Sequence, residues 1–85
     1  MKPHVLIIDD EQNIVLSLSL ALRKEFEVDA ALTAADGLAK LRAGTYELVL
    51  LDLMIGEDDG LQVLEQIRAI SPQIQVIMIT AFGTI

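Results

Sequence analysis

The chain has 85 residues, of which 53% are hydrophobic and 22% are charged, and its formal net charge is −7 at pH 7. This balance predicts one small packed domain and excludes a disordered chain. The absence of cysteine excludes disulfides and thiolate metal sites, and the scattered basic residues argue against a nucleic-acid surface, because phosphate contacts need clustered Lys and Arg.

The first half of the chain alternates between predicted strands and helices. Residues 5–8, VLII, form an apolar run typical of a strand that is buried on both faces. A helix is predicted from residue 12 to about residue 24, and a short second strand near residues 28–32. The apolar stripe of this helix consists of Ile14, Leu18, Ala21 and Leu22. Residues 33–36 fit a capping box that begins a second helix, and Gly44 predicts a left-handed end to that helix.

The second half continues the alternation. Residues 48–51, LVLL, predict another strand buried on both faces. The polar stretch 56–60 is interpreted as a loop, in which Asp59 caps a third helix. That helix ends at the Ser-Pro pair 71–72, because proline disfavours helical backbone in the residue before it. Residues 75–80, QVIMIT, predict a fourth buried strand.

The order β-α-β-α-β-α-β predicts an α/β domain in which a doubly wound parallel sheet carries helices on both faces. Ligands bind to such sheets beyond the carboxyl ends of the strands, where the winding reverses. Asp9 and Asp10 follow the first predicted strand, Asp52 follows the third, and Thr80 closes the fourth. If the strand order is 2-1-3-4, the three carboxylates converge in one crevice.

Three carboxylates a few ångströms apart repel one another, so at least one should take up a proton unless a cation neutralises them. Mg²⁺ is the natural candidate, because it accepts one or two carboxylates together with a carbonyl and waters. A plainer alternative stays open, in which Asp10 and Glu11 favour the first turn of the following helix through its dipole. Asp52 and Thr80, placed at matching strand ends, favour the metal site.

Four short motifs occur in order along the chain, namely Asp9-Asp10, Asp52-Leu53-Met54, Asp59-Gly60 and Thr80-Ala81. Their order and spacing resemble the receiver domain of bacterial two-component response regulators, and the resemblance spans residues 1–85. The tail, residues 78–85, is most similar to receivers of the enhancer-binding activators related to nitrogen-regulation proteins. The resemblance implies a flavodoxin-like receiver fold with the strand order 2-1-3-4.

By this resemblance, Asp52 is the phosphoacceptor, which takes a phosphoryl group from a sensor histidine kinase with the help of Mg²⁺. The ion is expected to be held directly by Asp10 and Asp52, and by Asp9 through a water molecule. The backbone carbonyl of Met54 is expected to complete the protein ligands. Most of the catalysis in such a site is positioning and electrostatic stabilisation.

The same resemblance assigns one phosphoryl oxygen to the hydroxyl of Thr80 and another to the amide of Ala81. It implies a signalling module rather than an enzyme, one that at most catalyses its own phosphorylation and dephosphorylation. Any output in transcription regulation would lie in sequence outside this chain. His4, the single histidine, begins the first predicted strand at the end away from the site and is interpreted as a structural or surface residue.

The sequence departs from the family pattern in two ways. Relatives commonly carry a proline and a methionine where this chain has Gly56 and Asp58, which changes the loop beside the site. A full receiver also continues to a fifth strand, whose lysine pairs with the phosphoryl group, whereas this chain stops after the fourth and has no Lys or Arg after Arg68. We therefore expect a C-terminally shortened receiver with impaired phosphorylation.

A function of a different class stays open. The fourth predicted strand is apolar on both faces, and as a sheet edge it would invite pairing with another chain. This predicts a homodimer or a domain-swapped assembly through that strand. The alternative hypothesis is therefore a truncated or engineered structural or interaction fragment, which oligomerises through its open edge without being phosphorylated.

The sequence also indicates a location. The apolar run before Asp9 consists of only four residues, 5–8, which is too short for a signal peptide. No apolar run approaches the roughly 20 residues that a membrane span requires. We expect a soluble, cytoplasmic chain without membrane or nucleic-acid contacts.

Overall fold

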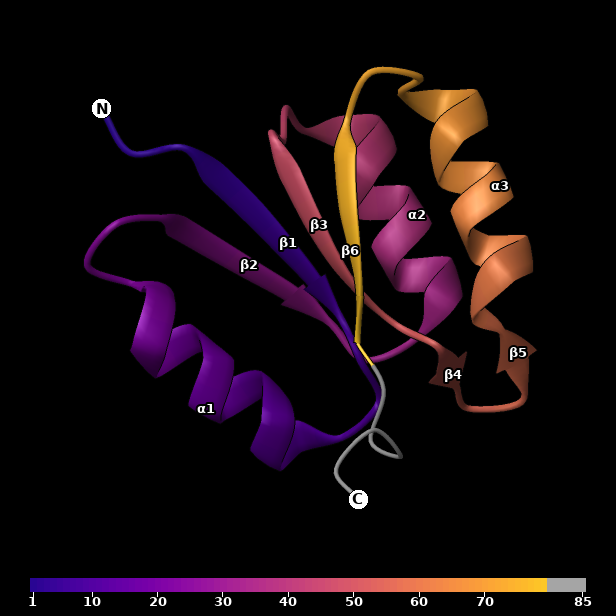
Figure 1. Ribbon diagram of the computed structural model, residues 1–85, viewed down its shortest axis with the longest axis horizontal. Helices are drawn as coiled ribbons and strands as arrows, with labels where there is room; N and C mark the ends of the chain where they lie inside the picture. Colours follow the sequence, from indigo (N-terminus) through magenta and orange to yellow (C-terminus); the bar gives the residue numbers. More distant parts are fainter. Residues whose placement is uncertain (80–85) are drawn as a thin grey trace.

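The computed structural model describes residues 1–79, which form a four-stranded sheet with helices on both faces and a separate two-stranded ribbon (Figure 1). In chain order the elements are β1 His4–Ile8, α1 Gln12–Leu22, β2 Glu27–Ala31, α2 Ala34–Ala43, β3 Leu48–Asp52, β4 Met54–Ile55, β5 Asp58–Asp59, α3 Gly60–Ile70 and β6 Gln75–Ile79. Within residues 1–79, no helix combines the length and the apolar character needed to cross a lipid bilayer.

The four long strands are parallel and lie in the order β2-β1-β3-β6. Because β6 is the fourth long strand of the sequence, the predicted order 2-1-3-4 and the predicted doubly wound α/β fold are confirmed. Helix α1 covers one face of the sheet, and α2 and α3 cover the other (Figure 1). The winding therefore reverses between β1 and β3, which is where such folds bind ligands.

The core explains why the strands read as continuous apolar runs. The side chains of Leu6 and Ile8 pack in the cluster beneath α2 and α3, whereas those of Val5 and Ile7 pack in the cluster beneath α1. All four are fully buried, since successive side chains of an interior strand point to opposite faces and both faces are covered. β1 is thus enclosed by helices on both sides.

The face that α1 turns toward the sheet agrees with the predicted stripe at Leu18 and Leu22 and differs from it elsewhere. Its half-buried residues include Val15, Leu18 and Leu22, whereas Ile14 and Ala21 of the predicted stripe are exposed. The helix sequence, QNIVLSLSLAL, is apolar around most of its circumference, so residue spacing did not determine which side is buried.

The second helix begins as predicted and ends differently. The hydroxyl of Thr33 accepts a hydrogen bond from the N–H of Asp36 at 3.1 Å, which caps the start of α2. At the other end, Gly44 is extended with φ of −121°, so the predicted left-handed stop is wrong. A Cβ atom on Gly44 would lie 3.0 Å from the ring of Tyr46, which indicates that the glycine makes room for this ring.

β4 and β5 form a small antiparallel ribbon, and residues 56–60, which were predicted as a loop, contain its turn and its second strand. The side chain of Ile55 is only 1% exposed and anchors the ribbon in the core, which the polar composition of residues 56–60 did not reveal. Gly56 turns the chain with φ of 60°, a left-handed conformation that glycine adopts without steric cost. Within residues 1–79, no residue other than glycine has a positive φ.

The ribbon joins α3 through a close backbone contact with β3. The N–H of Gly60 donates to the carbonyl of Leu53 at 2.8 Å. A Cβ atom on Gly60 would lie 2.8 Å from the carbonyl oxygen of Asp52 and still closer to that of Leu53, so only glycine fits there. The carboxylate of Asp59 accepts from the N–H of Leu61 at 3.0 Å and caps α3, as the sequence predicted.

At the other end of the sheet, polar side chains connect the starts of β1 and β3 to β2. The Nε2 atom of His4 lies 2.9 Å from Oδ2 of Asp29, and the Tyr46 hydroxyl donates to the same oxygen at 2.7 Å. The rings of His4 and Tyr46 lie 4.5 Å apart, and the N–H of His4 donates to the Glu47 carboxylate at 2.6 Å. Burial, followed by the hydrogen bond to Asp29, raises the pKa of Tyr46 to about 12.

This shift predicts a loss of stability in alkali. The unfolded chain releases the Tyr46 proton near the ordinary pKa of 10.0, whereas the folded chain retains it up to about 12, so the contribution is complete below pH 10 and is lost as the pH rises through this window. The free energy of unfolding should therefore fall more steeply in the wild type than in Tyr46→Phe over this range. Urea unfolding followed by circular dichroism measures both curves.

At neutral pH, Tyr46→Phe should be less stable than the wild type by about 1 kcal/mol, the usual net value of one hydrogen bond. The two stability curves should then converge as the pH approaches 12. Curves that stay parallel from neutral pH into alkali would contradict the assigned contact with Asp29.

Candidate metal centre

The parallel pairing of β1 and β3 brings three carboxylates to one edge of the sheet. Ile8 pairs with Leu51, so the residues that follow in each strand emerge together at the carboxyl edge. One carboxylate oxygen from each of Asp9, Asp10 and Asp52 lies within 4.8 Å of the other two. The structure thus assembles the acidic crevice from residues more than forty positions apart.

Each of these carboxylates accepts a hydrogen bond from a backbone amide. Asp9 is only 3% exposed, and its Oδ1 accepts from the N–H of Glu11 at 2.9 Å. The exposed Asp10 accepts through Oδ2 from the N–H of Gly56 at 2.9 Å. Oδ1 of the half-buried Asp52 accepts from the N–H of Met54 at 3.3 Å. The amides restrain all three side chains, and within residues 1–79 the second oxygen of each carboxylate has no amide donor.

The charge in the crevice is not balanced by basic side chains. Within residues 1–79, no Lys or Arg lies within ion-pair distance of these carboxylates, since the ion pairs formed there involve Asp29 and Asp36. Burial raises the pKa of Asp52, the charges of Asp9 and Asp10 raise it further, and the amide of Met54 opposes the rise. Ionised Asp52 is therefore held at an energetic cost.

The donor set fits a hard divalent cation. Mg²⁺ prefers oxygen ligands and is held in proteins through few carboxylates while it keeps several waters. Asp10 and Asp52 offer exposed or half-buried carboxylates, and Asp9 supplies a third charge from the buried floor of the crevice. The side chain of Met54 ends in a soft thioether, which does not suit Mg²⁺, so any role as a ligand falls to its main-chain carbonyl. The plainer alternative, in which Asp10 serves only the helix dipole, does not account for the neighbouring Asp52.

Two predicted site residues follow the end of β6. β6 pairs with β3 up to Ile79, which lies opposite Asp52, and the N–H of Leu53 donates to the Ile79 carbonyl at 2.8 Å. Thr80 and Ala81, which follow, lie outside the described residues. Their assignment to phosphoryl oxygens stays a prediction.

Sequence reasoning missed the amide of Gly56, which comes from the ribbon and reaches Asp10 across 46 positions of the chain. The only available signal was the glycine itself, at a position where the chain must turn.

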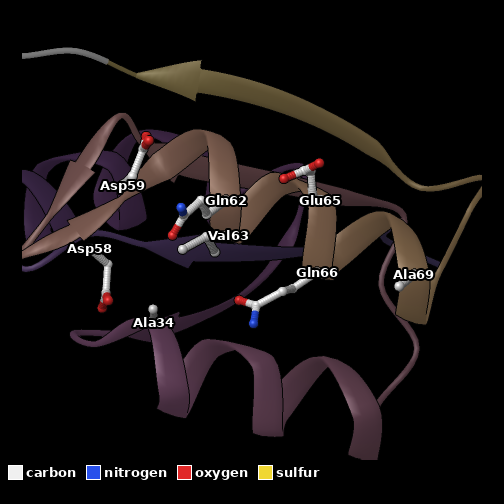
Figure 2. Close-up of a pocket in the computed structure, with 8 residues that line it drawn as sticks. All are labelled: Ala34, Asp58, Asp59, Gln62, Val63, Glu65, Gln66 and Ala69. Atoms are coloured by element: carbon white, nitrogen blue, oxygen red, sulfur yellow. The ribbon is translucent and has the colours of Figure 1, made fainter.

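A groove on the described surface is a different feature. Figure 2 shows this open groove between the start of α2, β5 and α3. Its volume is about 500 Å³. It is lined by Ala34, Asp58, Asp59, Gln62, Val63, Glu65, Gln66 and Ala69. Asp9, Asp10 and Asp52 do not line it, so the acidic crevice and this groove are separate.

Comparison with known proteins decides the family. Residues 5–85 match the family described as the response regulator receiver domain. The chain belongs to this family. The family and the receiver fold predicted from the four motifs are therefore confirmed, and receivers of this family are signalling domains of two-component systems.

Individual relatives agree with this assignment. The receiver is 36% identical over 83 residues to the transcriptional regulatory protein GlrR of Escherichia coli strain K12, an alignment that covers 96% of this chain and 19% of GlrR. Among eight curated relatives that it matches, the chain spans between 18% and 37% of their length. The match to a transcriptional regulator agrees with the kind of relative that residues 78–85 predicted.

Solved structures show the same fold. A CheY-like response regulator receiver domain protein from Methanospirillum hungatei JF-1 superposes with a TM-score of 0.92 and 30% identity, covering 100% of this chain and 69% of that one. The response regulator TrrA from Thermotoga maritima, solved in complex with Mg(2+)-BeF, gives 0.88 and 36%, covering 98% and 72%. The flavodoxin-like receiver topology is thus shared over the whole described chain.

The raised pKa of Asp52 predicts how its ionisation affects the stability of the fold. A raised pKa means that stability is greatest below the ordinary value of 3.8 and is lost as the pH rises through the folded value, because the ionised form is disfavoured in the folded state. Without divalent cations, Asp52→Asn should therefore increase the free energy of unfolding at pH 7, by roughly 1 kcal/mol for relief of like-charge contacts near a surface.

Urea unfolding in the presence of a chelator measures this change, and the gain should shrink as the pH is lowered and Asp52 becomes protonated. Glu65→Gln is the matched control, since Glu65 is an exposed carboxylate of α3 outside the crevice, and it should change stability little. Equal effects of the two substitutions would show that the crevice places no special cost on Asp52.

Proposed function

We propose that this chain is a phosphoacceptor receiver, which takes a phosphoryl group onto Asp52 from a sensor histidine kinase in the presence of Mg²⁺. The observation that carries the proposal is the convergence of Asp9, Asp10 and Asp52 within 4.8 Å at the carboxyl edge of β1 and β3. This edge is the ligand-binding edge of a doubly wound sheet. Membership in the receiver family supports the same role.

The geometry favours Asp52 over its two neighbours as the acceptor. Asp9 is buried and holds the amide of Glu11, so it is the least accessible of the three. Asp10 is exposed but lies at the start of the loop into α1, where its carboxylate is held by Gly56. Asp52 ends β3, is half-buried, and accepts a long hydrogen bond of 3.3 Å from the N–H of Met54. A fixed backbone and a reachable oxygen are what a nucleophile needs.

We assign the ligands of Mg²⁺ to the carboxylates of Asp10 and Asp52, to the main-chain carbonyl of Met54, and to Asp9 through a water molecule. When bound, the ion supplies charge neutralisation for the carboxylates and for the incoming phosphoryl oxygens. TrrA, to which this receiver is similar, was solved in complex with Mg(2+)-BeF, which supports a magnesium site in the shared fold.

The chain's own residues define the transfer step. A carboxylate oxygen of Asp52 attacks the phosphorus of a phosphohistidine, a new O–P bond forms, and the P–N bond breaks with its electron pair returning to the imidazole nitrogen. The product is an acyl phosphate on Asp52. The hydroxyl of Thr80 and the amide of Ala81 are proposed to donate hydrogen bonds to phosphoryl oxygens. Because the phosphoryl group remains on Asp52 as a covalent modification, the step suits a signalling module better than an enzyme that releases its product.

The output is proposed to be regulation of transcription in the cytoplasm. GlrR, to which the receiver is similar, is a transcriptional regulatory protein, and this receiver corresponds to 19% of its length. In this proposal phosphorylation of the receiver is the input, and a separate region reads it.

Labelling with a small phosphodonor tests the function directly. With acetyl phosphate and Mg²⁺, the wild type should take up one phosphoryl group that hydroxylamine removes, as expected for an acyl phosphate. Asp52→Asn should take up none, because the nucleophile is gone. Intact-protein mass spectrometry measures the added mass, and Asp58→Asn is the matched control on the nearby ribbon.

Retention of label in Asp52→Asn would assign the acceptor to another residue. Absence of label in the wild type with the donor at saturation would remove the phosphoacceptor proposal and leave the structural alternative.

We also propose that the 85-residue chain self-associates through β6. Within residues 1–79, β6 pairs with β3 alone, and the side chain of Ile77 is 53% exposed on this outer strand. An unpaired apolar strand edge favours pairing with another chain.

Analytical ultracentrifugation tests the association. At tens of micromolar the chain should sediment as a dimer or larger species, and Ile77→Lys should shift it toward the monomer by placing a charge on the outer strand. Leu61→Lys, which alters an exposed apolar residue of α3, is the matched control. A monomeric wild type at these concentrations would contradict the association.

A further inference from the structure

The residue that follows Asp52 is held from two directions. The carbonyl of Leu53 accepts a hydrogen bond from the N–H of Gly60 at 2.8 Å, and the N–H of Leu53 donates to the carbonyl of Ile79 at 2.8 Å. Gly60 is the first residue of α3, and Ile79 is the last residue of β6. The backbone directly after Asp52 is therefore fixed between the start of a helix and the end of a neighbouring strand.

Gly60 approaches this backbone more closely than a residue with a side chain could. A Cβ atom on Gly60 would lie 2.8 Å from the carbonyl oxygen of Asp52 and closer still to that of Leu53. The φ of Gly60 is not positive, so alanine could adopt the same backbone conformation without strain. The glycine is therefore required by lack of space, and the space is occupied by the backbone of the proposed phosphoacceptor.

The two elements on either side of this contact are fixed in the core. α3 is anchored by Val63 and Ile67, which are 2% and 0% exposed, and β3 pairs with β1 on one side and with β6 on the other. An added methyl group would therefore displace the short segment between them, the peptide units of Asp52 and Leu53. The carbonyl oxygen of Asp52 would have to retreat by roughly 0.6 Å to reach ordinary contact at 3.4 Å. Such a shift turns the side chain that leaves the same backbone.

We propose that Gly60 is a positioning residue of the phosphoacceptor site. Its missing side chain lets α3 begin against the end of β3, and its N–H holds the Leu53 carbonyl, so that the Asp52 carboxylate is aimed into the acidic crevice. A small displacement matters here, because misplacing a reacting group by about 1 Å can cost roughly a hundredfold in rate. The proposal rests on the phosphoacceptor function proposed above.

Labelling kinetics test the positioning role. With acetyl phosphate and Mg²⁺ both at saturation, Gly60→Ala should take up label on Asp52 roughly tenfold more slowly than the wild type, because its nucleophile is misaligned. Saturation separates the rate of transfer from the affinity for donor or ion. Alanine favours helix more than glycine does, so apart from the collision the substitution should not weaken α3. Far-ultraviolet circular dichroism establishes that the variant is folded, and intact-protein mass spectrometry measures the rate. An unchanged rate in the folded variant would overturn the proposal.

Two controls separate alignment from stability. Gly44→Ala adds the same methyl group at the other end of the sheet, where a Cβ atom would lie 3.0 Å from the ring of Tyr46, and its rate should stay within about twofold of the wild type. Asp59→Ala removes the cap of α3 without adding volume beside Asp52, and its rate should stay within about threefold. Equal slowing in Gly60→Ala and Asp59→Ala would overturn the proposal, because a loosened helix start would then explain the effect.

A measurement on the wild type makes the test independent of how the variants fold. In ¹⁵N-labelled chain, addition of Mg²⁺ should shift the amide resonances of Leu53 and Gly60 with the same half-saturation, because one hydrogen bond joins the two residues. The amide resonance of Gly44, at the other end of the sheet, should stay in place. A Gly60 resonance that stays in place while that of Leu53 moves would contradict the coupling on which the positioning role depends.

The outcomes also separate this inference from the function on which it rests. If the wild type is labelled on Asp52 and folded Gly60→Ala is labelled equally fast, the positioning role fails and the phosphoacceptor role stands. If the wild type takes no label with the donor at saturation, both are overturned.

Discussion

The parallel pairing of β1 with β3 is the constraint on which the site depends. Ile8 lies opposite Leu51, so the chain must deliver Asp9, Asp10 and Asp52 to the same edge. Full burial of one aliphatic side chain stabilises the fold by about 1.5–3 kcal/mol, and β1 and β3 contain several of them. Repulsion among partly hydrated carboxylates amounts to a few kcal/mol in total. The core therefore outweighs the repulsion, and the fold can hold an unfavourable charge cluster at its binding edge.

Much of this architecture could be predicted because strands buried on both faces appear in the sequence as continuous apolar runs. The runs VLII and LVLL identified the interior strands, and acidic residues directly after them identified the edge where the charges meet. The family resemblance supplied the strand order, which periodicity cannot give. The cap of α2 by Thr33 and that of α3 by Asp59 followed from local chemistry, because the donor and the acceptor of each cap lie within three residues.

What the sequence could not give depends on contacts between distant segments. The inward face of α1 was predicted correctly at Leu18 and Leu22 and wrongly at Ile14. The helix is apolar nearly all round, and packing against Val5 and Ile7 selects Val15 over Ile14. The sequence predicts a loop at residues 56–60 and misses the strand β5 there, because the ribbon depends on the burial of Ile55 among its tertiary neighbours. The contact of Gly56 with Asp10 leaves no pattern at all, since a backbone donor is present at almost every residue.

The two ends of the sheet are held in opposite ways. At the amino ends of β1 and β3, His4, Tyr46 and Asp29 connect three segments by direct contacts, whereas at the carboxyl ends like charges push the strands apart. The amino ends of β1 and β3 are therefore fixed by direct contacts, whereas their carboxyl ends carry the electrostatic repulsion. When the metal-free sheet opens thermally, the strands should separate first at their carboxyl ends, so the part of the sheet that binds the ligand is also the least stable part.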